Sequence, residues 1–391
     1  MNQTDTKKGY FFSQPHQPFF LLATINAVVM MLLFMLSYKG ILTLTLDSLT
    51  FHSYSLIFFL FSNAFSGFLF TTFPRFNQTQ VIDKRFYTTI FFANALGATL
   101  FVAGAFTSLI GVTLGMGVTL ISQIFTFKKL YEIYKTGAAV DKSDSFWILS
   151  AFAFGLLGNL LYIFSLANTS LQSIAINISF YMFIIFLAFS VGQRMIPFFS
   201  HSFAQKDPRF VKVVFGLSLL TSIFSSSGFE VGEIIVDLVL GGYMLNEFRR
   251  WELHPLQSPP ILWVLHLALF WLPAAFFISA ISLTAEMFLE TSFYFLNIHL
   301  LAIGFLTTVL IGFGTRVILG HSGQPPHGDN IATKIFYFIQ IVVLLRALFS
   351  INVAFGWGAN FLFDISATAW MLLFLIWGGR YFKTLVYGTK L

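Results

Sequence analysis

The sequence predicts an all-α, polytopic membrane protein with about twelve transmembrane helices and both termini in the cytoplasm. Three observations lead to this fold class. Hydrophobic residues make up 57% of the 391 positions and charged residues only 10%. The mean hydropathy is +0.81. The apolar residues form separate segments, and the basic residues alternate between the loops that join them. A soluble domain carries about 25% charged residues, so this composition excludes a water-soluble enzyme, a disordered chain and a nucleic-acid binder.

The apolar segments are long enough to cross a bilayer, which takes about 20 mostly apolar residues per helix. Two divisions are less marked than the rest: the split of 86–127 into two helices, and the short eighth span with acidic residues at its start. The twelve predicted spans are 18–38, 51–73, 86–105, 107–127, 146–166, 172–192, 210–228, 230–246, 260–280, 292–314, 333–353 and 361–379.

Basic residues give the orientation of these spans. The even-numbered loops and the two tails hold 20 of the 22 Lys and Arg residues. Because cytoplasmic loops are enriched in Lys and Arg, the tails 1–17 and 380–391 are predicted to be cytoplasmic. The net charge of +6 therefore reports membrane orientation. The first 17 residues lack the apolar stretch of a cleavable signal peptide, and we expect one integral membrane domain over 1–391.

Some kinds of chemistry are excluded by the sequence. The chain has no cysteine, which removes disulfides, thiolate-bound haem and Cys-ligated iron–sulfur clusters. It contains no phosphate-binding loop, no GxGxxG after a strand, no HExxH and no GxSxG. Histidines and carboxylates at membrane depth are the remaining candidates, because ionisable groups there are costly.

One candidate layer lies toward the outer ends of the helices. It contains His52 in the second span, His299 in the tenth, and a face of the eighth span formed by Glu230, Glu233 and Asp237. Imidazoles and a carboxylate at similar depth can ligate a transition metal or pass protons. The simpler alternative is that Glu230 and Glu233 only solvate a helix end.

A second layer lies at the cytoplasmic ends. It includes His16 before the first span, Arg194 after the sixth, and Arg316 and His321 after the tenth. The positive-inside rule by itself accounts for arginines at these positions. His266 in the ninth span is more typical of a core histidine bonded to a neighbouring helix than of a metal ligand.

Four segments together resemble the NnrS family of bacterial inner-membrane proteins, and the resemblance covers nearly the whole chain. The third and fourth segments are the most specific. The segments are 16–20 (HQPFF), 51–55 (FHSYS) with 67–74 (GFLFTTFP), 192–200 (GQRMIPFFS), and 299–325 with its end RVILGHSGQP.

This resemblance implies a haem- and copper-containing protein of the inner membrane, linked to nitric oxide and nitrosative stress and often found near denitrification functions. The motif histidines correspond to His16, His52, His299 and His321. The motif arginines correspond to Arg194 and Arg316.

The sequence departs from the family pattern at three positions. Tyr54 replaces the second histidine of W-H-x-H-E-M, Ser55 replaces its glutamate, and Gln324 replaces the arginine of H-T-G-R-P. If that histidine binds metal in relatives, this chain lacks the centre or builds it differently. Tyrosine can ligate haem iron, and a divergent paralogue with reduced metal loading is an equal alternative.

Two sites follow from matched depth and motif position. His52 and His299 are predicted to share a metal, with Asp237 accepting a hydrogen bond from an imidazole. Separately, His16 and His321 are predicted to bind a cofactor with Arg194 and Arg316, whose guanidinium groups pair with haem propionates.

The function predicted from these features is a haem- and copper-binding component of the nitric oxide response, with a redox, sensing or detoxifying role. Its expected partners are the lipid bilayer, nitric oxide or a redox partner. A secondary transporter or channel is one alternative, although the sequence shows no internal repeat. The other alternative is an accessory protein of a respiratory complex.

Overall fold

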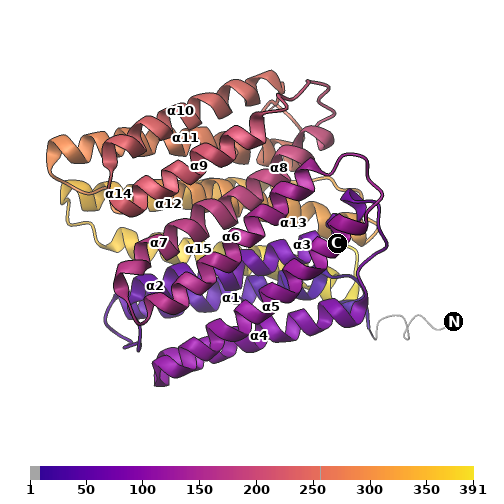
Figure 1. Ribbon diagram of the computed structural model, residues 1–391, viewed down its shortest axis with the longest axis horizontal. Coiled ribbons are helices and arrows are strands. Elements are labelled where there is room, and N and C mark those ends of the chain that lie inside the picture. Colours follow the sequence, from indigo (N-terminus) through magenta and orange to yellow (C-terminus); the bar gives the residue numbers. More distant parts are fainter. Residues whose placement is uncertain (1–8, 256) are drawn as a thin grey trace. The chain divides into compact units, whose positions relative to one another are not determined.

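The computed structural model describes residues 9–255 and 257–391, and within these residues every regular element is a helix (Figure 1). The chain forms two compact units. Unit 1 contains the described residues up to Ile184, together with Val317–Pro325 and Phe374–Leu391. Unit 2 contains Ile185–Arg316 and Pro326–Leu373. Of the predicted N-terminal tail, residues 1–8 lie outside the described residues.

Unit 1 is built from the first six long helices and from parts of later ones. Its elements are α1 (His16–Tyr38), α2 (Ser48–Tyr54), the π-helix η2 (Ser55–Phe61), α3 (Ser62–Phe76), α4 (Lys84–Thr107), α5 (Leu109–Thr136), α6 (Ser143–Ser165) and α7 (Gln172–Asn177). The end of α13 and the second half of α15 (Phe361–Tyr387) complete it.

Unit 2 contains the remaining helices. They are α8 (Phe186–Phe199), α9 (Phe210–Ser227), α10 (Glu230–Arg250), α11 (Pro260–Leu289), α12 (Leu296–His299), the π-helix η5 (Leu300–Thr307), most of α13 (Thr308–His321), α14 (Asn330–Phe355) and the first half of α15. A third π-helix, η4 (Ile178–Ile185), lies between α7 and α8 in the sequence.

The predicted fold class is confirmed. Eleven helices in the described part of the chain are long and apolar enough to cross a membrane, and they coincide with eleven of the twelve predicted spans. The predicted eighth span also forms a helix, α10, but its charged residues, acidic at its start and mostly basic at its end, keep it outside this set. The last helix, α15, continues to Tyr387, past residue 379, where the last predicted span ends.

The split of 86–127 is confirmed, and the close approach of α4 to α5 depends on glycines. Ser108 is extended (φ −167°, ψ 147°) and caps α5 by accepting from the Gly111 N–H at 3.2 Å. A Cβ added to Gly104 would lie 2.1 Å from the Val112 nitrogen, and one added to Gly115 would lie 2.4 Å from the Phe101 nitrogen. Glycines allow the two backbones to approach this closely. Close packing holds membrane helices together because lipid tails supply no hydrophobic force between them.

Three membrane spans share a π-helical segment, and they recur at every fourth position in the chain. They are the second (Ser48–Phe76), sixth (Thr169–Phe199) and tenth (Leu296–His321) predicted spans. Their apolar windows are 94, 89 and 78% buried, whereas the other spans reach at most 61%. π-Helical segments are rare in proteins, and those that occur are often found at functional sites. The three spans that contain them here also carry most of the motif residues.

Candidate functional site

Within unit 1, the rings of His16 and His321 lie next to each other although 305 positions separate the two residues in the sequence. Their ring centres are 4.6 Å apart, with the ring planes inclined at 47°. His16 is 2% exposed and is the first residue of α1, and His321 is the last residue of α13. The structure brings these two predicted site residues together, and their role in binding a cofactor stays a prediction.

Local sequence explains how His16 is held. The Gln17 side chain accepts from the Gln14 backbone N–H at 2.8 Å, which fixes the start of α1. Pro18 lies in the first turn, where a missing N–H costs no helical hydrogen bond. On α3, a Cβ added to Gly67 would lie 2.7 Å from the Phe19 Cβ and 3.2 Å from the His16 Cα. Gly67 therefore lets α3 approach the backbone of His16.

Both imidazoles present a nitrogen that forms no hydrogen bond within the described residues. His321 donates from Nδ1 to the Val317 carbonyl at 3.0 Å, because a carbonyl oxygen only accepts. This bond places the proton of the neutral ring on Nδ1 and leaves the lone pair on Nε2, which is buried and without a partner. The buried Nδ1 of His16 is also without a partner. Metal-bound histidines commonly show this arrangement, with the other ring nitrogen donating to a backbone carbonyl.

The separation of the two rings fits one kind of metal site better than another. A metal about 2 Å from a ring nitrogen lies about 3 Å from the ring centre. Two imidazoles on opposite sides of one iron would then have centres about 6 Å apart, and imidazoles in adjacent positions would have centres about 4–5 Å apart. The observed 4.6 Å matches adjacent ligands of a single ion. No group of three or more His, Cys, Asp or Glu side chains that could hold a metal occurs among residues 9–255 and 257–391. An ion bound to these two histidines would therefore need additional ligands of another kind, such as water or a small molecule.

Arg75 is a charged neighbour of this pair that was not predicted as a site residue. It lies in the last turn of α3 and is close enough to His321 to interact with it electrostatically. The sequence signal was present, since Arg75 follows Pro74 at the end of the segment beginning at Gly67. It was assigned only to the positive-inside pattern.

Arg194 and Arg316 both belong to unit 2. The Arg316 guanidinium carbon lies 3.9 Å above the ring centre of Phe199, so a cation–π contact joins the third and fourth motif segments. Arg194 is half-buried near the end of α8. The predicted haem site, which joins these arginines to His16 and His321, stays a prediction.

The second predicted set also stays a prediction, and its members have these surroundings. His52, on α2, stacks on Phe34 with ring centres 4.0 Å apart. His299 donates from Nδ1 to the Phe295 carbonyl at 2.8 Å. Asp237 is fully buried, and its Oδ1 accepts from the Thr221 hydroxyl at 2.8 Å.

His266 is a core residue, as the sequence suggested. It is 2% exposed, and its Nε2 lies 2.6 Å from the Ser200 hydroxyl, which follows α8. This hydrogen bond connects α11 to the end of the third motif segment.

A family model described as NnrS protein matches residues 10–387. The chain belongs to the NnrS family. No curated protein matches the chain. Membership confirms the resemblance drawn from the four segments. Tyr54, Ser55 and Gln324 are the positions at which this chain differs from the pattern expected from that resemblance.

At the first departure from the NnrS pattern, Tyr54 lies in a buried polar network of unit 1. Its hydroxyl donates to the Asn159 Oδ1 at 3.1 Å, and Asn159 donates to the Gln123 Oε1 at 2.8 Å. The Tyr54 ring stacks on Phe101, with centres 5.1 Å apart. The neighbouring Ser55 hydroxyl donates to the His52 carbonyl at 3.2 Å. Both side chains are therefore hydrogen-bonded within the protein.

Gln324, the third departure, also forms hydrogen bonds within unit 1. Its Nε2 donates to the Ser322 hydroxyl at 2.8 Å, and its Oε1 accepts from the Leu391 N–H at 2.9 Å. These bonds link the segment after α13 to Leu391.

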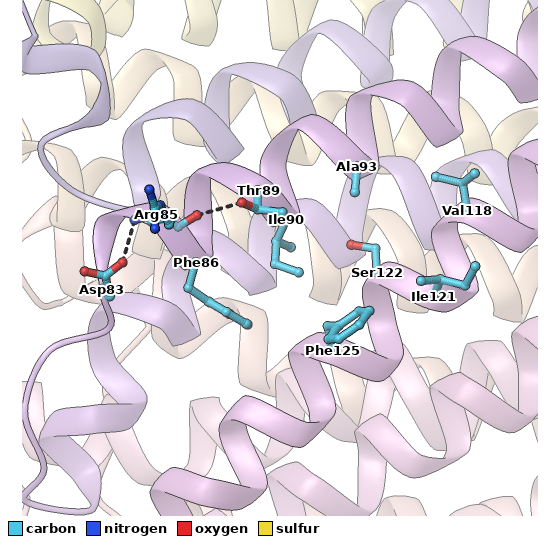
Figure 2. Close-up of a pocket in the computed structure, with 10 residues that line it drawn as sticks. All are labelled: Asp83, Arg85, Phe86, Thr89, Ile90, Ala93, Val118, Ile121, Ser122 and Phe125. Atoms are coloured by element: carbon cyan, nitrogen blue, oxygen red, sulfur yellow. Dashed lines mark hydrogen bonds between the residues drawn. The ribbon is translucent and has the colours of Figure 1, made fainter.

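An apolar groove on α4 and α5 has a volume of about 580 Å³ (Figure 2). Ile90 and Ala93 line its middle, Asp83 and Arg85 lie at one end, and Ile121 lies at the other. It contains none of the predicted site residues, and its apolar lining suits a lipid chain.

Proposed function

We propose that this NnrS-family chain is a haem- and copper-binding protein of the bacterial inner membrane. In this proposal it acts in the response to nitric oxide and nitrosative stress, as a redox, sensing or detoxifying component. Family membership supports the biological context. The observation that supports metal binding is the His16–His321 pair, in which each ring has a buried nitrogen without a hydrogen-bond partner among the described residues.

The protein's own residues prepare this pair for a metal. The Val317 carbonyl sets the tautomer and orientation of His321. The first turn of α1 and the close passage of Gly67 position His16. His16 is buried and His321 is half-buried, and the Nδ1 of His16 and the Nε2 of His321 are both buried atoms with no hydrogen-bond partner among the described residues. When bound, copper would supply one-electron redox chemistry and a position for a small ligand.

The ring separation does not fit two imidazoles on opposite sides of one haem iron. We propose that His16 and His321 would together hold one copper ion. Arg194 and Arg316 are proposed to bind the anionic propionates of a haem, since guanidinium groups pair with carboxylates in two-pronged geometry. The stacking of Arg316 on Phe199 reduces the conformational freedom that such binding would cost.

Metal analysis and absorption spectroscopy test the proposal on protein purified from membranes. We expect copper and a haem Soret band in the unaltered protein. We expect His16→Ala and His321→Ala each to lower copper affinity by at least about tenfold, because second-sphere changes alone cost 10- to 100-fold. The exposed His201 offers a matched control, and His201→Ala should retain the copper.

Each outcome bears on a separate part of the proposal. Unaltered protein without copper and without a Soret band would exclude the metal-binding function. Copper that persists in both histidine variants would exclude this ligand pair. Loss of the Soret band with copper retained in His321→Ala would assign His321 to haem instead.

A further inference from the structure

Unit 2 contains a line of carboxylates that the proposed copper and haem sites do not use. Glu230, Glu233 and Asp237 lie on one face of α10, because residues three and four apart share a helix face. Their burial increases along the helix. Glu230 is exposed, Glu233 is 5% exposed and Asp237 is 0% exposed. Seven residues of helix separate the first from the last, a rise of about 10 Å.

Asp237, the deepest member, is surrounded by hydroxyl groups from neighbouring helices. Thr221 of α9 donates to its Oδ1 at 2.8 Å. Ser279 of α11 interacts with the same carboxyl group, and the Ser279 hydroxyl accepts from the Asn297 amide at 3.1 Å. The Asp237 Oδ2 is buried and has no partner of normal hydrogen-bond geometry among the described residues.

Among the described residues, the groups that interact with Glu233 and Asp237 are hydroxyls and carboxyl groups. Glu233 interacts with Ser225 of α9, with Asp237 and Glu230 on its own helix, and with Glu286 of α11. Glu286 accepts from the Phe293 N–H at 2.5 Å. A buried ionised carboxylate with only hydroxyl partners and acidic neighbours is costly, and such a group becomes neutral instead. Asp237 avoids this cost when its side chain is protonated to the neutral carboxylic acid.

We propose that Asp237 is a proton-binding site, which exchanges its proton with water at the Glu230 end of α10 through Glu233. A proton from water binds the Asp237 carboxylate at Oδ2 and converts it to the neutral acid, and release reverses this step. No other bond forms or breaks. Glu233 lies between the exposed and the buried carboxylates, and the Ser225, Thr221 and Ser279 hydroxyls can reorient as donors or acceptors. According to the predicted orientation, the proton enters from the outer side of the membrane.

A buried carboxylate in the same helix gives an internal control. Glu247 is 2% exposed, but it accepts from the Arg250 guanidinium and from the Trp251 indole N–H at 2.8 and 3.0 Å. Glu247 is therefore about as buried as Asp237, but it has a cationic partner that stabilises its ionised form. Asp237 and Glu247 differ in their partners rather than in burial.

The first experiment uses the full chain in lipid vesicles and reads the protonation state directly. Infrared spectra at neutral pH should contain the carbonyl band of a protonated carboxylic acid, which Asp237→Asn removes and Glu247→Gln retains. Asparagine keeps the acceptor for Thr221, and a size-exclusion profile checks that the variant folds. A spectrum unchanged by Asp237→Asn would overturn the proposal. Loss of the band in the unaltered protein on adding sodium ions would also overturn it, because the site would then bind a metal cation.

The second experiment tests the route. Glu233→Gln should leave the Asp237 band in place but slow its hydrogen–deuterium exchange by about tenfold or more, because positioned proton carriers contribute at least this much to transfer rates. Glu286→Gln, which removes a neighbour outside the line, should exchange at the rate of the unaltered protein. Equal exchange rates in Glu233→Gln and the unaltered protein would overturn the route through Glu233.

Discussion

Tyr54 shows how a single substitution can change the use of a motif position. The hydroxyl donates to Asn159, which continues to Gln123, and the ring packs against Phe101. The resemblance to the NnrS family leads us to expect a histidine at this position. In this chain the position contributes to a buried hydrogen-bond network of unit 1, so Tyr54 supports packing between α2, α5 and α6.

Tyr54→Phe should therefore destabilise the protein without changing its metal content. The substitution removes one buried hydrogen bond and leaves the Asn159 Oδ1 without its donor, a loss of about 1–3 kcal/mol in unfolding free energy. Denaturant unfolding in detergent measures this effect. Tyr131→Phe is the matched control, since Tyr131 is 50% exposed. A fall in copper with unchanged stability would instead indicate that Tyr54 is a ligand.

At the scale of elements, the contact between α4 and α5 depends on glycine positions. Gly104 has no room for a Cβ, whereas a Cβ on Gly117 of α5 would meet nothing within 4 Å. The two glycines therefore differ in what surrounds them, although both lie in membrane helices. Close backbone approach is the reason that Gly104 cannot be replaced.

Gly104→Ala should cost about 1–3 kcal/mol in unfolding free energy, because an added methyl group forces the two backbones apart. Gly117→Ala should be neutral or slightly stabilising, because alanine is the better helix former. The midpoint of thermal unfolding in detergent compares the two variants. Equal midpoints would contradict the close packing of α4 against α5.

The three π-helical segments were not predicted from the sequence. Hydropathy detects a span by its average composition, and a π-helix has the same composition as an α-helix. Within η5, the Thr307 hydroxyl donates to the carbonyl of Ala302, five residues earlier in the same segment, at 2.8 Å. The recurrence of these segments in the second, sixth and tenth spans therefore appears only in the structure.

At the scale of the whole molecule, the absence of cysteine permits a direct test of topology. Single cysteines can be introduced without background in a chain that has none. Ser170→Cys lies in a predicted outer loop and Thr136→Cys at a predicted cytoplasmic helix end, and both positions are exposed. A membrane-impermeant maleimide should label Ser170→Cys on intact cells and Thr136→Cys only after permeabilisation. The reverse pattern would contradict the orientation assigned from the basic residues.

The sequence by itself determined the spans and the family. Apolar length and charge alternation are local properties, so the helix positions agreed with the structure within a few residues at most ends. The eighth span, with its acidic start, is one of the two divisions that the sequence defines least clearly. The helix α15 runs to Tyr387, past the predicted end of the last span, because a helix can carry basic residues such as Arg380 and Lys383 beyond the apolar core of the bilayer.

The site depended on tertiary structure. Motif position suggested that His16 and His321 belong together, but only the fold gives a 4.6 Å ring separation and a Val317 carbonyl that sets the tautomer. The sequence assigned Asp237 to a metal site, whereas its hydrogen bond to Thr221 motivates the proton-binding proposal. Hydrogen-bond partners and ring distances are set by packing between helices far apart in the chain. Composition and spacing carry no information about which side chains will meet there.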